Sequence, residues 1–97
     1  MAKSINPTKH VVKRAGHREL YDGRKLYASI FAACLSVRTP VGEAELVAAQ
    51  VQQLVEDWLE RKHEVTGHDI RLHAAKHLKA FNPDAAYMYR SHRDLHL

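Results

Sequence analysis

The sequence has few of the residues that characterise secreted or membrane-bound proteins. Its 97 residues include one cysteine, so no internal disulfide can form, and without CxxC pairs we expect a cytoplasmic protein. No run approaches the roughly 20 apolar residues that span a bilayer, and residues 1–10 lack the apolar segment of a secretory signal. Cys34 stands in the apolar run IFAACL, which indicates a buried thiol rather than a reactive one.

Catalytic motifs are also absent. The sequence contains no GxSxG, GxxxxGK[ST], GxGxxG or HExxH. Its paired carboxylates, Glu43 with Glu45 and Glu56 with Asp57, fall on helix faces expected to be exposed. We therefore predict that the protein is not an enzyme.

The positive charge is concentrated in one part of the chain. Residues 9–25 hold six Lys and Arg against two acids, which equals the whole net charge of +4. Residues 39–64 hold six acids against Arg61 and Lys62. This separation indicates one localised anion site rather than general affinity for anionic surfaces.

The chain length predicts one domain, at residues 10–97, preceded by a flexible basic arm at residues 1–9. Two short segments, 10–14 and 17–21, flank Ala15-Gly16 and predict a β-hairpin with a two-residue loop. That loop sets Val11 opposite Leu20. The β-branched segment 63–67 is short enough to add a third strand, which an isolated hairpin would need for stability.

Apolar periodicity and caps predict four helices. The first is capped by Asp22 and runs to about Val37, the second spans about 42–61, the third about 68–80, and the fourth starts near Pro83. The predicted core stripe of the second helix is Val47, Val51, Leu54 and Trp58, supported by Val55 and Leu59, and Phe81 is expected to face inward from the third. The expected class is α+β, mainly α: a four-helix bundle capped at one end by a small three-stranded β-sheet.

Cations from two elements could converge near the hairpin. Lys13 and Arg14 end its first strand, and Arg24 and Lys25 lie in the first turn of the following helix, so together they could hold phosphate oxygens. Glu19 and Asp22 suit a sugar hydroxyl, a base edge or hydrated Mg²⁺ instead. On the residues alone a solvated basic face, a phosphate site and a nucleic-acid surface all stay open.

The eight histidines include two pairs with helical spacing. His73 and His77 are four residues apart, as are His92 and His96, and this spacing can hold zinc. No cysteine or carboxylate completes a recognisable ligand pattern nearby. Ordinary surface or half-buried histidines are therefore the preferred interpretation, and no metal site is predicted.

Three segments together resemble the ATP-cone domain family. VVKRAGHRELYDGRKLYASIFAA resembles its opening, EVTGHDI its short strand and third-helix start, and AAYMYRSHR its closing segment. The resemblance covers about residues 10–94. It implies a regulatory, non-catalytic domain that binds ATP or dATP, with Mg²⁺ as an accompanying ion, at the hairpin end of a small helical bundle. It also implies control of ribonucleotide reductase, through self-association or docking on a reductase subunit or another partner, rather than binding to nucleic acid or membranes.

The resemblance assigns roles to individual residues. It places Lys13, Arg14 and Lys25 on the phosphates, Glu19 and Asp22 near the adenine and sugar, and the backbone of Val12 on the base. Thr66 and Arg71 fall in the region that closes over the sugar or phosphate, and Arg90 and Arg93 match the terminal basic residues. These ten residues form the predicted nucleotide site.

The sequence also departs from the family pattern. Ala15 replaces the usual Asp or Asn of the turn, and Gly67-His68-Asp69 replaces S-x-D, so Thr66 is expected to supply the hydroxyl. Neither a zinc ribbon nor a reductase barrel accompanies the domain in these 97 residues. Two alternatives therefore stay open: a basic nucleic-acid-binding accessory protein, and a degenerate cone that acts as a protein-interaction domain.

Overall fold

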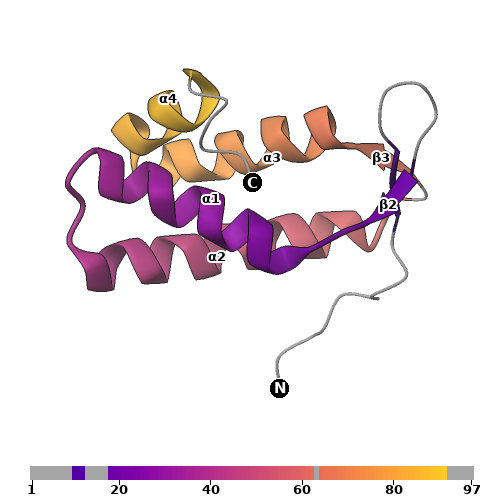
Figure 1. Ribbon diagram of the computed structural model, residues 1–97, viewed down its shortest axis with the longest axis horizontal. Helices are drawn as coiled ribbons and strands as arrows, with labels where there is room; N and C mark the ends of the chain where they lie inside the picture. The colour runs from indigo at the N-terminus through magenta and orange to yellow at the C-terminus, as the bar shows by residue number, and fades with distance from the viewer. Residues whose placement is uncertain (1–9, 13–17, 63, 92–97) are drawn as a thin grey trace.

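The computed structural model describes residues 10–12, 18–62 and 64–91, with side chains described from Leu20 onward. It contains four helices and three short strands (Figure 1). The strands are β1 His10–Val12, β2 Arg18–Leu20 and β3 Val65–Thr66. The helices are α1 Gly23–Ser36, α2 Val41–Leu59, α3 Gly67–Phe81 and α4 Pro83–Ser91.

The four helices pack into two antiparallel pairs. α1 lies against α2, and α3 lies against α4; the pairs join where α1 contacts α4 and α2 contacts α3 (Figure 1). Each helix therefore touches two others and can bury one apolar face between them. Among the described residues, no helix is both long and apolar enough to cross a membrane.

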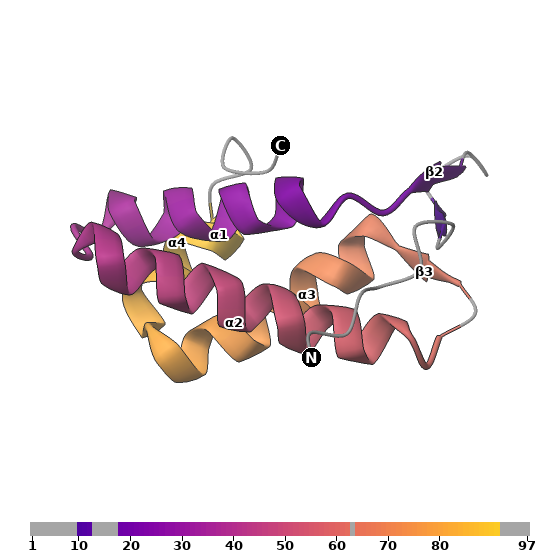
Figure 2. The same ribbon diagram turned by 90° about the horizontal axis from the view of Figure 1, so that it is seen from below.

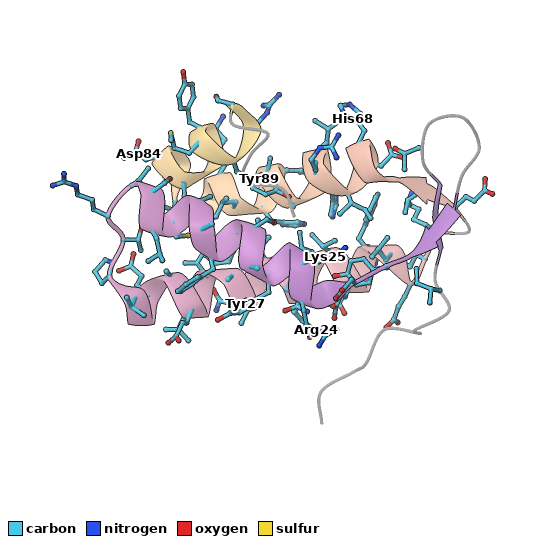
Figure 3. The ribbon with its side chains drawn as sticks, viewed as in Figure 1. Arg24, Lys25, Tyr27, His68, Asp84 and Tyr89 are labelled. Carbon is cyan, nitrogen blue, oxygen red and sulfur yellow. The ribbon has the colours of Figure 1, made fainter. Side chains whose placement is uncertain are left out.

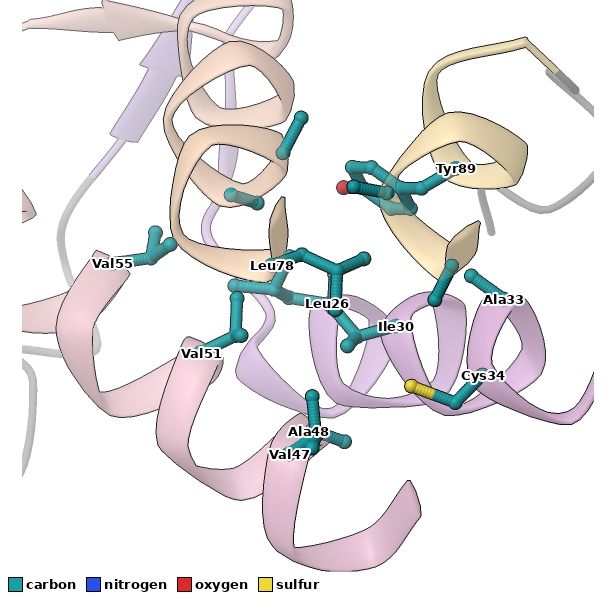
Figure 4. Close-up of a cluster of buried hydrophobic side chains, with 14 of the residues drawn as sticks. Leu26, Ile30, Ala33, Cys34, Val47, Ala48, Val51, Val55, Leu78 and Tyr89 are labelled. Carbon is teal, nitrogen blue, oxygen red and sulfur yellow. The ribbon is translucent and has the colours of Figure 1, made fainter. Parts of the chain in front are cut away.

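The core lies between the helices and consists largely of small and β-branched side chains. Figure 4 shows how residues from all four helices meet there. Ile30, Val51 and Leu78 are fully buried, and Cys34 is buried as expected. Burial raises the pKa of the Cys34 thiol, which keeps it protonated and unreactive near neutral pH.

Local signals in the sequence determine where the helices begin and end. Asp22 caps α1 by accepting a hydrogen bond from the Arg24 backbone N–H at 3.0 Å, which confirms the predicted cap. Pro83 is the first residue of α4, also as predicted, and the Asn82 side chain accepts from the Ala85 N–H. Arg38, with φ of 63°, reverses the chain direction after α1.

The predicted fold class is wrong in its β component. The described chain is mostly helical, and its strands have only three, three and two residues. They pair in the order β2-β1-β3, but segments this short cannot form a layer that covers the end of the bundle. Leu20, the one apolar side chain described in β2, is 56% exposed, so this strand covers no core. The protein is better classed as a small helical bundle with minimal strand pairing.

The predicted hairpin register is also wrong, by one residue. Val11 pairs with Glu19 and His10 pairs with Leu20, whereas a two-residue loop would set Val11 opposite Leu20. Pairing of Val12 with Arg18 leaves five residues, 13–17, between the strands. The predicted loop residues Ala15-Gly16 lie outside the described part of the structure, and the correction concerns only the register of the two strands.

Two residues that were predicted to lie in the core, Leu54 and Phe81, face outward. The buried stripe of α2 runs through Val47, Val51, Val55 and Leu59, while Leu54 is 36% exposed. Trp58 is partly buried and packs against the core. Phe81, the last residue of α3, is 43% exposed, whereas Leu78, three residues earlier on the same helix, is fully buried.

Candidate functional site

The strands bring the starts of α1 and α3 to the same end of the bundle. β1 lies between β2 and β3, with Val12 paired to Thr66 in parallel and to Arg18 in antiparallel fashion. β3 continues directly into α3, and β2 reaches α1 after two residues. Figure 2 shows both helices starting on the side of the molecule that carries the strands. Two helix N-termini, each with a partial positive charge, thus flank β1.

Cationic side chains stand in the first turns of both helices. Lys25 lies on α1 and is exposed, next to Arg24, whose side chain is 94% exposed (Figure 3). Arg71 lies on α3, one turn after Gly67, and is also exposed. These exposed cations, together with the two helix N-termini at this end of the bundle, favour an anionic ligand there.

Asp22 and Thr66 occupy equivalent positions, because each caps one of these helices. The Thr66 hydroxyl accepts from the Asp69 N–H at 3.0 Å, and the Asp69 carboxylate accepts from the Thr66 N–H at 3.1 Å. This capping box fixes the start of α3. An accepting hydroxyl retains its own proton to donate, and the Asp22 carboxylate stays partly exposed, so both can also contact a ligand.

A hydrogen-bonded group that sequence analysis missed supports the start of α1. The Tyr21 hydroxyl donates to Oε2 of Glu56 on α2 at 3.0 Å, and Gln52 Nε2 donates to the same oxygen at 2.9 Å. Gly23 fits over this group: a Cβ there would lie 2.5 Å from Gln52 Nε2 and 2.6 Å from Glu56 Oε2. Burial and the neighbouring Glu56 carboxylate raise the pKa of Tyr21, so its hydroxyl stays a donor. No sequence signal could link positions 35 residues apart.

Replacing Tyr21 with Phe is expected to lower the free energy of unfolding by about 1–2 kcal/mol, because a charge-assisted hydrogen bond is lost without a change in shape. Tyr27→Phe is the matched control, since Tyr27 stacks on Phe31 with ring centroids 6.1 Å apart and its ring is retained. Urea denaturation of both variants measures the difference. Equal stability of the two would contradict a role for the Tyr21–Glu56 bond.

Several predicted site residues lie outside the described part of the structure. Lys13, Arg14 and Arg93 are not described, and for Val12 and Glu19 only the backbone positions in β1 and β2 are. Of the ten predicted residues, the structure therefore places five side chains: Asp22, Lys25, Thr66, Arg71 and Arg90. The first four stand in the first turns or caps of α1 and α3.

Arg90 lies elsewhere, in a groove between α3 and α4. The groove has a volume of about 540 Å³ and also holds Lys76 and Lys79 from the second half of α3. Tyr87, 70% exposed, stands at the same groove. Tyr89, by contrast, is buried, and its helix packs on α1. Lys76, Lys79 and Arg90 form a second cationic surface, of which sequence analysis singled out Arg90 but neither lysine.

Comparison with known proteins identifies the family. The family model described as ATP cone domain matches residues 9–97, almost the whole chain. No curated protein and no solved structure matched. ATP cones are nucleotide-binding regulatory domains without catalytic activity of their own. The chain belongs to the ATP-cone family.

Proposed function

We propose that this protein binds ATP or dATP at the strand end of the bundle and acts as a regulatory module. The observation that carries the proposal is the parallel pairing of Val12 with Thr66. It sets the strand that leads into Lys13 and Arg14 beside the N-terminus of α3. This pairing supports one site formed by the residues of the family's opening motif and those of its third-helix start.

The phosphates are assigned to the cations and helix starts. Lys25 and Arg71 extend from the first turns of α1 and α3, and the chain order places Lys13 and Arg14 directly after β1. These groups repel one another when no anion is present, so a triphosphate relieves repulsion and also accepts charge-assisted hydrogen bonds. Backbone N–H groups of two helix N-termini add further attraction.

The sugar and base are assigned to the remaining groups. Asp22 and Glu19 would accept from ribose hydroxyls or the adenine amino group, the Val12 backbone would face the base, and the Thr66 hydroxyl would donate. Discrimination between ATP and dATP requires a buried partner for the 2′-hydroxyl, because an exposed hydroxyl changes the affinity little.

The regulatory output is proposed to be self-association or docking on a partner, of which a ribonucleotide reductase subunit is the leading candidate. We assign Arg90 and Arg93 to this self-association or docking, or to a second phosphate contact, rather than to the phosphate site at the starts of α1 and α3. The reason is that Arg90 lies at the α3–α4 groove.

Calorimetric titration with ATP and with dATP, with and without Mg²⁺, tests the proposal. We expect saturable binding of at least one nucleotide, and a change in particle size by light scattering when the preferred one is added. Absence of binding heat with both nucleotides, together with salt-sensitive DNA or RNA binding that ATP does not displace, would favour the nucleic-acid alternative instead.

A further inference from the structure

Two histidines on α3 face each other at the distance of a metal chelate. The Nε2 atoms of His73 and His77 lie 3.0 Å apart, and their rings meet edge to face at 79°. They share one hydrogen bond, so one Nε2 donates and the other accepts. Both side chains are half-buried and lie outside the proposed nucleotide site.

An aromatic side chain from α2 holds this pair in position. The Trp58 ring stacks on the His73 ring with centroids 4.3 Å apart and planes inclined by 14°. Lys62 Nζ lies 5.7 Å from the Trp58 ring centroid on a face of the same indole. Stacking limits rotation of His73, so its Nε2 stays directed toward His77 and less ordering entropy is lost when a ligand bridges the two nitrogens.

The nitrogen separation matches a particular coordination geometry. With metal–nitrogen bonds of about 2.0–2.1 Å, two nitrogens 3.0 Å apart subtend an angle of about 90–97° at the metal. That is the angle between adjacent ligands of a square-planar or tetragonal ion, whereas a tetrahedral ion needs a wider separation. Tetragonal sites with nitrogen and oxygen ligands are typical of Cu²⁺ and Ni²⁺, and Cu²⁺ binds more tightly.

We propose that His73 and His77 form a two-nitrogen binding site for Cu²⁺, which Ni²⁺ and Zn²⁺ occupy more weakly. The donating ring would change to its other neutral tautomer, with the proton on Nδ1, and the metal would lie to one side of the line that joins the two Nε2 atoms, with both rings turned toward it. Two metal-bound waters leave as the two nitrogens bind. The other coordination positions keep water, because no cluster of three or more His, Cys, Asp or Glu forms within the described ranges.

Charge near the pair has opposing effects on this site. Burial is the main cause that lowers the pKa of both histidines. The facing His77 and then Lys76, Arg61 and Lys62 lower that of His73 further, and Lys76 lowers that of His77. Neutral imidazole is the form that binds a metal, so this direction of the pKa shift favours binding. The same cations repel a divalent ion, so we expect moderate rather than tight affinity.

Trp58 provides a direct readout, because it is the only tryptophan in the sequence and stacks on a proposed ligand. Cu²⁺ at Nε2 is expected to quench its fluorescence saturably with one equivalent. The Cu²⁺ EPR spectrum should show coupling to two nitrogens. Ni²⁺ and Zn²⁺ should compete for the site at higher concentrations.

Variants separate this pair from the other histidines. His77→Ala keeps the Trp58–His73 stack and is expected to weaken Cu²⁺ binding on the order of 100-fold, because a chelate becomes a single imidazole. His68→Ala, an exposed histidine on the same helix, and the double variant His92→Ala/His96→Ala should leave the titration unchanged. Quenching that survives His77→Ala, or that is lost in the His92/His96 variant, would overturn the assignment.

Discussion

Replacing Lys25 with Glu is expected to weaken ATP or dATP binding by about 100-fold or more. The change removes one charge-assisted hydrogen bond to phosphate, which contributes about 1.5–3 kcal/mol, and places a carboxylate beside the triphosphate. Folding should not suffer, since the first turn of α1 contains no acidic residue and a negative charge there is favourable for the helix dipole. Calorimetric titration gives the affinity, and thermal denaturation without nucleotide checks the fold.

Lys79→Glu is the matched control. Lys79 is also an exposed lysine on a helix, but it lies in the last turn of α3 at the α3–α4 groove. The two variants have the same net charge, so a general electrostatic effect would weaken binding equally in both. Equal losses would place the nucleotide away from α1 and contradict the proposed site.

Replacing Tyr89 with Ala is expected to lower the free energy of unfolding by about 3–5 kcal/mol, the usual cost of removing a buried aromatic ring. Tyr89 is 2% exposed and lies among core residues of α1 and α3 in Figure 4. Ser29 of α1 hydrogen-bonds its hydroxyl, and burial raises the pKa of that hydroxyl. A 97-residue domain has a total stability of only about 5–15 kcal/mol, so the loss should be visible as a large decrease in the urea midpoint.

Tyr87→Ala provides the comparison on the same helix. Its side chain is 70% exposed, so the change should alter the free energy of unfolding by about 0.5 kcal/mol or less. If Tyr89→Ala is too unstable to purify, Tyr89→Phe isolates the hydroxyl, with an expected cost of about 1 kcal/mol. A Tyr89→Ala variant as stable as Tyr87→Ala would contradict the packing of α4 on α1.

The helices could be predicted because their signals are local. Asp22, Pro83 and the apolar spacing of the first helix act within a few residues, and the structure has their helices where these signals placed them. The β component could not be predicted in the same way. The pairing of Val11 with Glu19 depends on the number of loop residues, and a change of one residue shifts every pair.

The same difference between local signals and contacts distant in sequence applies to the candidate site. The motif order predicted that Lys25 and Thr66 serve one site, and the pairing of β1 with β3 is consistent with this because it brings the starts of α1 and α3 to one end. The support of Tyr21 by Glu56 and the facing nitrogens of His73 and His77 depend on side-chain directions and on contacts between helices. Spacing alone indicates neither. The position of Arg90 in the α3–α4 groove likewise follows from how α4 packs, which the closing motif does not specify.

Amide NMR of the isotope-labelled protein, titrated with ATP and with dATP, tests the central claim most directly. The account predicts that the largest shifts fall at the starts of α1 and α3, around Gly23–Lys25 and Thr66–Arg71, and that Gly42 at the start of α2 is unaffected. Shifts confined to the α3–α4 groove around Lys79 and Arg90, or no shifts with either nucleotide, would contradict it.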